Sequence, residues 1–84
     1  MKDLVIIYSN DNQECERAVS FIESLNKNYL VYKLNQHFSQ RSFDQEFGKK
    51  AEYPQIAIGY RHVGGLKETL NHMRETGQFA FFLF

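Results

Sequence analysis

The sequence predicts a single α/β domain, spanning residues 1–84, with the element order β-α-β-α-β-β-α. Two apolar runs rich in β-branched and aromatic residues, 4–8 and 29–34, flank a segment with helical periodicity. A strand, a helix and a strand in this order predict a right-handed crossover with the two strands parallel. Two short strands joined by a turn follow, so the predicted sheet has four strands of mixed direction and is flanked by three helices.

The first strand, "LVIIY" at residues 4–8, is continuously apolar, which predicts a central strand covered on both faces. The next residues, "SNDN", have turn chemistry, and Asp11 or Asn12 can cap the helix that follows. Glu14, three residues after Asp11, would complete a capping box. We expect this helix to run from about Asn12 to about Asn26. Its apolar stripe consists of Cys15, Ala18, Val19, Phe21, Ile22 and Leu25.

The second half of the chain predicts a short helix, a hairpin and a final helix. Residues 39–47 carry Phe43 and Phe47 four positions apart after a Ser39 cap, and Gly48 ends this helix. The stretch "QIAIGYRHVGG" has the pattern of two antiparallel strands with a turn near Gly59. The last helix, "LKETLNHMRETG", places Leu66, Leu70 and Met73 on one face and ends at Gly77.

Composition and charge exclude several classes of function. Ten basic and ten acidic residues give a formal net charge of zero, so no overall field attracts nucleic acid or an anionic membrane. A single cysteine makes neither an internal disulfide nor a structural zinc site. The histidines, His37, His62 and His72, are not at metal-ligand spacing, and we expect no metal. No segment has the pattern of a signal peptide or a membrane span, so we expect a cytoplasmic protein.

The segment "EYPQIAIGYRHVGGLKETL" resembles the glutaredoxin stretch commonly written TVPQIFINGKHIGGFDDL. Tyr53-Pro54-Gln55-Ile56 matches the Val-Pro-Gln-Ile of that family, and His62-Val63-Gly64-Gly65 matches its His-Ile-Gly-Gly. The resemblance extends from Val5 to about Gly77. It implies a minimal thioredoxin/glutaredoxin fold with a cis Tyr53-Pro54 bond opposite the helix that bears the active site, and the brevity of the chain suggests a viral member.

The physical chemistry of these residues predicts a ligand groove. The residue before a cis-proline presents its backbone N–H and C=O, so Tyr53 can pair with an extended peptide or with glutathione. Gly64 and Gly65 leave bare backbone donors at a positive helix end, which suits a carboxylate. Gln40, with its neighbour Arg41, is a candidate carboxylate contact at the start of the second helix. The alternative is that Pro54 merely starts a strand, that the glycines turn a corner and that Gln40 lies on a solvated face.

The catalytic motif departs from that of the family. Glutaredoxins have Cys-Pro-Tyr-Cys at this helix start, whereas this chain has Asn12-Gln13-Glu14-Cys15. The apolar residues after Cys15 lie at the spacing that follows the second cysteine of the family. In this register Asn12 occupies the nucleophile's place, where it would line the substrate groove, and Cys15 matches the resolving thiol. A rival register makes Cys15 the nucleophile and Ala18 the lost second thiol, but it places Ser24 on the buried stripe.

Two functions remain open. The resemblance implies a thiol-disulfide oxidoreductase with a degenerate active site, in which Cys15 is the candidate catalytic residue. Glutathione would be its co-substrate only if the site tolerates Lys67, because the family has Asp at that position and the charge is reversed. The alternative is a redox-inactive module that binds a protein through the groove near Pro54 or through the aromatic C-terminus, Phe79 to Phe84. In either case we expect a monomer or a weak homodimer.

Overall fold

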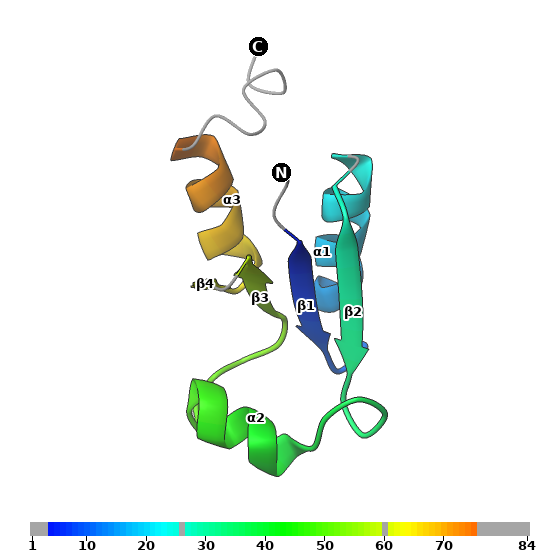
Figure 1. Cartoon of the computed structure of the whole chain (residues 1–84), viewed down its shortest axis with the longest axis vertical. Coiled ribbons are helices and arrows are strands. Elements are labelled where there is room, and N and C mark those ends of the chain that lie inside the picture. The colour runs from blue at the N-terminus through cyan, green and yellow to red at the C-terminus, as the bar shows by residue number, and fades with distance from the viewer. Residues whose placement is uncertain (1–3, 26, 60, 76–84) are drawn as a thin grey trace.

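A computed structural model describes residues 4–25, 27–59 and 61–75, and these residues have the predicted element order. The sheet order is β2-β1-β3-β4; β1 and β2 are parallel, and the other two pairings are antiparallel. The elements are β1 (Val5–Ser9), α1 (Gln13–Ser24), β2 (Tyr29–Lys33), α2 (Gln40–Phe47), β3 (Gln55–Ile58), β4 (Arg61–Gly64) and α3 (Leu66–Glu75) (Figure 1). The predicted fold class, a four-stranded mixed sheet with three helices, is confirmed.

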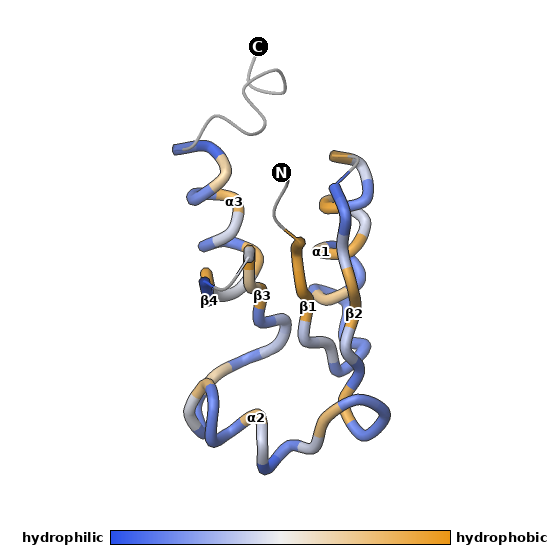
Figure 2. The backbone as a smooth tube through the Cα atoms, in the orientation of Figure 1, coloured by the Kyte–Doolittle hydropathy of each residue, from blue (hydrophilic) through white to orange (hydrophobic). Residues whose placement is uncertain are grey.

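The hydrophobic core lies between the sheet and the two helices α1 and α3. Val5 and Ile7 of β1 point toward this layer and are buried. They meet residues of α1, β3 and α3: Ala18, Ile22, Ile56, Ile58 and Met73. Figure 2 shows the first part of β1 in orange, as a strongly apolar segment of the sheet. No helix among the described residues is long and apolar enough to cross a membrane.

The opposite face of β1 is only partly covered. Ile6 and Tyr8 are half-buried, and Leu30, which is paired with Ile6 in the sheet, is 45% exposed. The expectation that the first strand is buried on both faces is therefore wrong. The physical reason is the position of α2, which lies beyond the carboxyl ends of β1 and β2 (Figure 1) and contacts Tyr8 through its aromatic rings.

The start of α1 distinguishes between the two predicted caps. Asn12 is the N-cap, because its Oδ1 accepts a hydrogen bond from the backbone N–H of Cys15 at 2.8 Å. Asp11 has a positive φ of 65° and lies before the cap. The predicted capping box with Glu14 is wrong, because the backbone N–H of Asp11, which Glu14 would accept, donates instead to Ser9 Oγ at 2.9 Å. The helix ends at Ser24, and Asn26 lies outside the described residues.

Aromatic side chains attach α2 to the sheet. Ser39 caps this helix as predicted and Gly48 ends it. Phe43 is buried, stacks on Tyr53 at a centroid distance of 4.2 Å and lies 4.7 Å from Phe47. The aromatic cluster comprises Tyr8, Phe38, Phe43, Phe47 and Tyr53. It brings the segment before β3 close to α2 and so positions the residues of the groove described next.

The hairpin and the last helix follow the predicted pattern. Strands β3 and β4 are antiparallel, and Gly59 has the positive φ of 64° that the turn between them requires. Tyr60 lies outside the described residues. Met73 of α3 is buried in the core, and Leu66 packs against it. Gly77 and the segment Phe79 to Phe84 also lie outside the described residues.

Candidate ligand-binding groove

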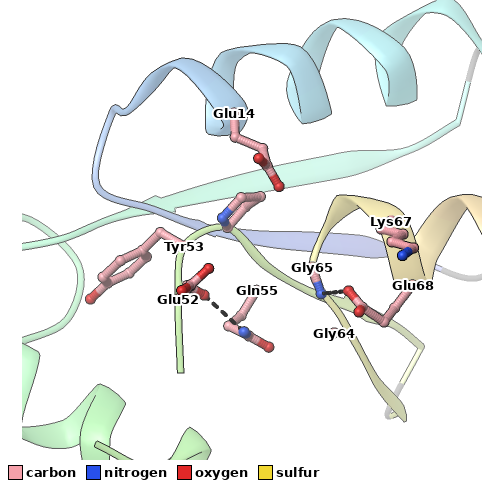
Figure 3. Close-up of a pocket in the computed structure, with 9 residues that line it drawn as sticks. Glu14, Glu52, Tyr53, Gln55, Gly64, Gly65, Lys67 and Glu68 are labelled. Carbon is pink, nitrogen blue, oxygen red and sulfur yellow. Dashed lines mark hydrogen bonds between the residues drawn. The ribbon is translucent and has the colours of Figure 1, made fainter. Parts of the chain in front are cut away.

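The candidate site lies where the start of α1, the segment before β3 and the start of α3 converge (Figure 3). The Tyr53-Pro54 bond is cis, as the resemblance implied, and Pro54 is buried. A cavity of about 400 Å³ opens beside it. The lining residues are Glu14, Glu52, Tyr53, Pro54, Gln55, Gly64, Gly65, Lys67 and Glu68. The structure therefore brings four of the predicted binding residues together in one groove.

Asn12 lies at the edge of this groove and connects two elements. Its Oδ1 caps α1, and its Nδ2 donates a hydrogen bond to the backbone carbonyl of Tyr53 at 3.3 Å. A ligand that uses this carbonyl must therefore compete with Asn12. The backbone N–H of Tyr53 has no hydrogen-bond partner among the described residues. One of the two backbone groups that Tyr53 presents is thus satisfied within the chain, and the other is unpaired.

The side chain of Tyr53 turns away from the groove and packs on α2. Its hydroxyl donates to Gln40 Oε1 at 2.9 Å, and Gln40 Nε2 donates to Asp44 Oδ1 at 2.8 Å. Burial, followed by the nearby Asp44 carboxylate, raises the pKa of Tyr53 above its usual value. Because both ends of its amide are engaged in this way, Gln40 orients Tyr53 and does not line the cavity.

The Gly64-Gly65 pair is packed closely against Glu68. Gly64 has a positive φ of 124°, and a Cβ there would lie 3.0 Å from Glu68 Cβ. The backbone N–H of Gly65 donates to Glu68 Oε1 at 3.0 Å. The predicted donor is present, but a carboxylate of the chain already occupies it. Sequence reasoning missed Glu68; the signal that could have found it is a Glu three residues after the residue preceding the helix.

Cys15 does not line this groove. Its side chain is 1% exposed, and its Sγ lies 3.6 Å from Asn10 Oδ1. The thiol borders a second cavity of about 400 Å³ between α1 and β2, which Lys33 also lines. No group of three or more metal-ligating side chains occurs within residues 4–25, 27–59 and 61–75. The structure thus separates the cysteine from the groove, whereas Asn12 contacts the backbone carbonyl of Tyr53 at the groove's edge.

Comparison by sequence finds no matching protein family and no matching curated protein. Among solved structures, the chain is similar to a buckwheat glutaredoxin crystallised in complex with glutathione, with a TM-score of 0.72. The alignment covers 93% of this chain and 74% of that chain at 20% sequence identity. The chain therefore has a glutaredoxin-like fold, of the thioredoxin-like type, and its sequence contains a single cysteine.

Proposed function

We propose that this protein is a glutaredoxin-fold binding module that holds an extended peptide of a partner protein and does not exchange disulfides. The observation that carries this proposal is the position of Asn12. Its amide donates to the Tyr53 carbonyl at 3.3 Å, while Cys15 is buried and only 1% exposed. In the register set by the apolar stripe of α1, Asn12 stands where a nucleophilic cysteine would face the ligand.

The backbone of Tyr53 supports an extended ligand. An extended peptide can pair with an exposed backbone edge, and its side chains then enter neighbouring pockets. The unpaired N–H of Tyr53 is one such donor, and the cavity of about 400 Å³ beside Pro54 is the neighbouring pocket. The glutathione complex of the structurally similar buckwheat protein is consistent with a peptide-like ligand on this fold.

The burial of Cys15 argues against disulfide exchange. A thiolate must reach a sulfur atom of the substrate to attack it, and a reactive cysteine is accordingly partly exposed. Cys15 is in the interior of the α1 stripe and its thiol is in contact with Asn10. At 1% exposure, Cys15 offers almost no surface for a substrate to contact.

Peptide titration tests the proposal. The neutral probe is a blocked pentapeptide, Thr-Val-Gln-Val-Thr, added to the 15N-labelled protein. We expect the amide resonances of Tyr53, Gln55 and Gly65 to shift most. Asn12→Ser keeps a capping oxygen but cannot reach Tyr53, so it frees the carbonyl and should tighten binding. Shifts confined to other parts of the chain, or no saturable shift, would refute the groove as the binding site.

A one-thiol oxidoreductase is the second candidate. It is favoured by the second cavity, of about 400 Å³, which Cys15 lines together with Lys33. Reduction of a mixed glutathione disulfide should then depend on Cys15 and disappear in Cys15→Ser. Equal, near-background rates in the two proteins would exclude this candidate. Turnover that depends on Cys15, with a thiolate populated below pH 7, would instead refute the inert module.

A partner can also bind through the C-terminal aromatic segment. Residues 79–84 contain four phenylalanines and no charge. A complex that survives groove substitutions but is lost when residues 79–84 are removed would assign the contact to that segment.

A further inference from the structure

The groove beside Pro54 has an unbalanced charge. Three carboxylates, Glu14, Glu52 and Glu68, line it together with one ammonium group, that of Lys67. In Figure 3 Glu14 extends from α1 toward the groove, Glu52 lies beside Tyr53 and Gln55, and Glu68 enters from α3. The ion pairs found among the described residues, Lys33 with Asp11 and His62 with Glu46, include none of these carboxylates.

The position that suits an anion in this groove is already filled. A helix N-terminus attracts negative charge through its free N–H groups. At the start of α3 the N–H of Gly65 donates to Glu68 Oε1 at 3.0 Å, within the same helix turn. An incoming carboxylate would have to displace Glu68 and approach Glu14 and Glu52. Anionic ligands are therefore disfavoured both by the occupied donor and by the surrounding charge.

We propose that this pocket selects a positively charged side chain, lysine or arginine, of the bound peptide and rejects anionic ligands such as glutathione. This inference rests on the proposed function, because it names the ligand class of the same groove. Tyr53 supplies the backbone contact, and the cavity of about 400 Å³ has room for one long side chain. The carboxylates of Glu14, Glu52 and Glu68 supply the charge that a neutral peptide groove would lack.

The effect of each carboxylate is modest because all three side chains are exposed and water screens them. Exposed ion pairs contribute about 0.2–1 kcal/mol, which corresponds to a change of roughly 1.4- to five-fold in affinity per carboxylate. Selectivity then comes from the three groups acting together, and it should weaken at high salt.

Three matched peptides test the charge preference. Blocked Thr-Val-X-Val-Thr, with X as Lys, Gln or Glu, is titrated against the wild-type protein with the amide shift of Gly65 as readout, and glutathione is titrated separately. We expect the Lys peptide to bind at least about three-fold more tightly than the Gln peptide, because three effects of about 1.4-fold each multiply. The Glu peptide and glutathione should bind more weakly than the Gln peptide.

Isosteric variants assign the preference to named residues. Glu68→Gln keeps an oxygen that can accept the Gly65 N–H and removes only the charge. It should weaken the Lys peptide, and the triple variant with Glu14→Gln and Glu52→Gln should abolish the preference. Glu16→Gln, on the same helix as Glu14 but outside this groove, removes the same charge and should leave the preference unchanged.

The outcomes separate this inference from the proposed function. Equal binding of all three peptides at Tyr53 and Gly65 would refute the charge preference and leave the peptide groove intact. Tightest binding of the Glu peptide or of glutathione would overturn the inference directly. If Glu16→Gln reduces the preference for the Lys peptide as much as Glu68→Gln does, the preference comes from the overall charge of the protein, and this result would also overturn the inference. Absence of binding by every peptide would refute the proposed function itself.

Discussion

Two substitutions of Asn12 distinguish the contributions that its two hydrogen bonds make to the stability of the fold. Asn12→Ala removes the N-cap bond to the Cys15 N–H, 2.8 Å long, and the bond to the Tyr53 carbonyl, 3.3 Å long. Loss of an N-cap side chain costs about 1 kcal/mol, and loss of an exposed hydrogen bond at the weak end of the range costs about 0.5 kcal/mol. We therefore expect Asn12→Ala to lower the free energy of unfolding by about 1.5 kcal/mol.

Asn12→Asp provides the matched control. Its carboxylate oxygen can still cap α1, and a negative charge at a helix N-terminus contributes about 0.3–1 kcal/mol. The Asp side chain cannot donate to the Tyr53 carbonyl, which costs about 0.5 kcal/mol. The favourable charge at the helix end offsets this cost, so the net change in the free energy of unfolding should be close to zero.

Urea denaturation followed by circular dichroism measures both variants. In a thermal melt, a loss of about 1.5 kcal/mol corresponds to a decrease of roughly 6–12 °C in Tm for a domain of this size. A cost for Asn12→Asp equal to that of Asn12→Ala would refute the capping argument. A cost below about 0.5 kcal/mol for Asn12→Ala would contradict the contribution of both bonds.

Three further predictions concern the surroundings of the groove. Phe43→Ala removes a side chain that is 2% exposed and stacked on Tyr53, so it should cost about 3–5 kcal/mol in urea denaturation; a cost near 1 kcal/mol would contradict the packing. Gly64→Ala should destabilise the fold more than Gly48→Ala. Both positions have a positive φ, but only at Gly64 would the added Cβ approach a neighbour, Glu68 Cβ at 3.0 Å. Equal decreases in Tm for the two variants would show that Glu68 moves away from the added Cβ without a cost in stability. Because the pKa of Tyr53 is raised in the folded protein, the native state keeps the phenol proton to a higher pH than the unfolded state, and the stability should fall as the pH rises above about 10. Tyr53→Phe should show a smaller decrease in the urea midpoint between neutral and alkaline pH. An identical decrease in the wild type and the variant would argue against the raised pKa.

The local elements could be predicted because their causes are local. The Ser39 cap, the phenylalanines four residues apart and the terminal Gly48 all lie within one short segment, and α2 begins and ends as they indicate. Asn12 was a candidate cap for the same reason. The error over Glu14 shows the limit of this reasoning. Ser9 Oγ accepts the backbone N–H of Asp11 that a capping box would use, and the pattern of residue types does not decide between the two acceptors.

The composition of the groove was partly predictable. Tyr53, Pro54, Gly64 and Gly65 were identified from the residues and the resemblance, and they line one cavity. Gln40 was assigned to the same site, yet α2 uses its amide to hold the Tyr53 hydroxyl. The position of α2 beyond the strand ends determines this, and that position depends on how aromatic rings from several segments pack together.

The sequence by itself determined the order of strands and helices, the start of α2 and the candidacy of Asn12 as the cap of α1. These features depend on periodicity, capping and spacing within a few residues. Only the tertiary structure decided that Cys15 is buried, that Asn12 reaches a carbonyl 41 residues away, and that Glu68 fills the donor at Gly65. Distances between atoms decide such contacts, and those distances exist only once the helices have packed on the sheet.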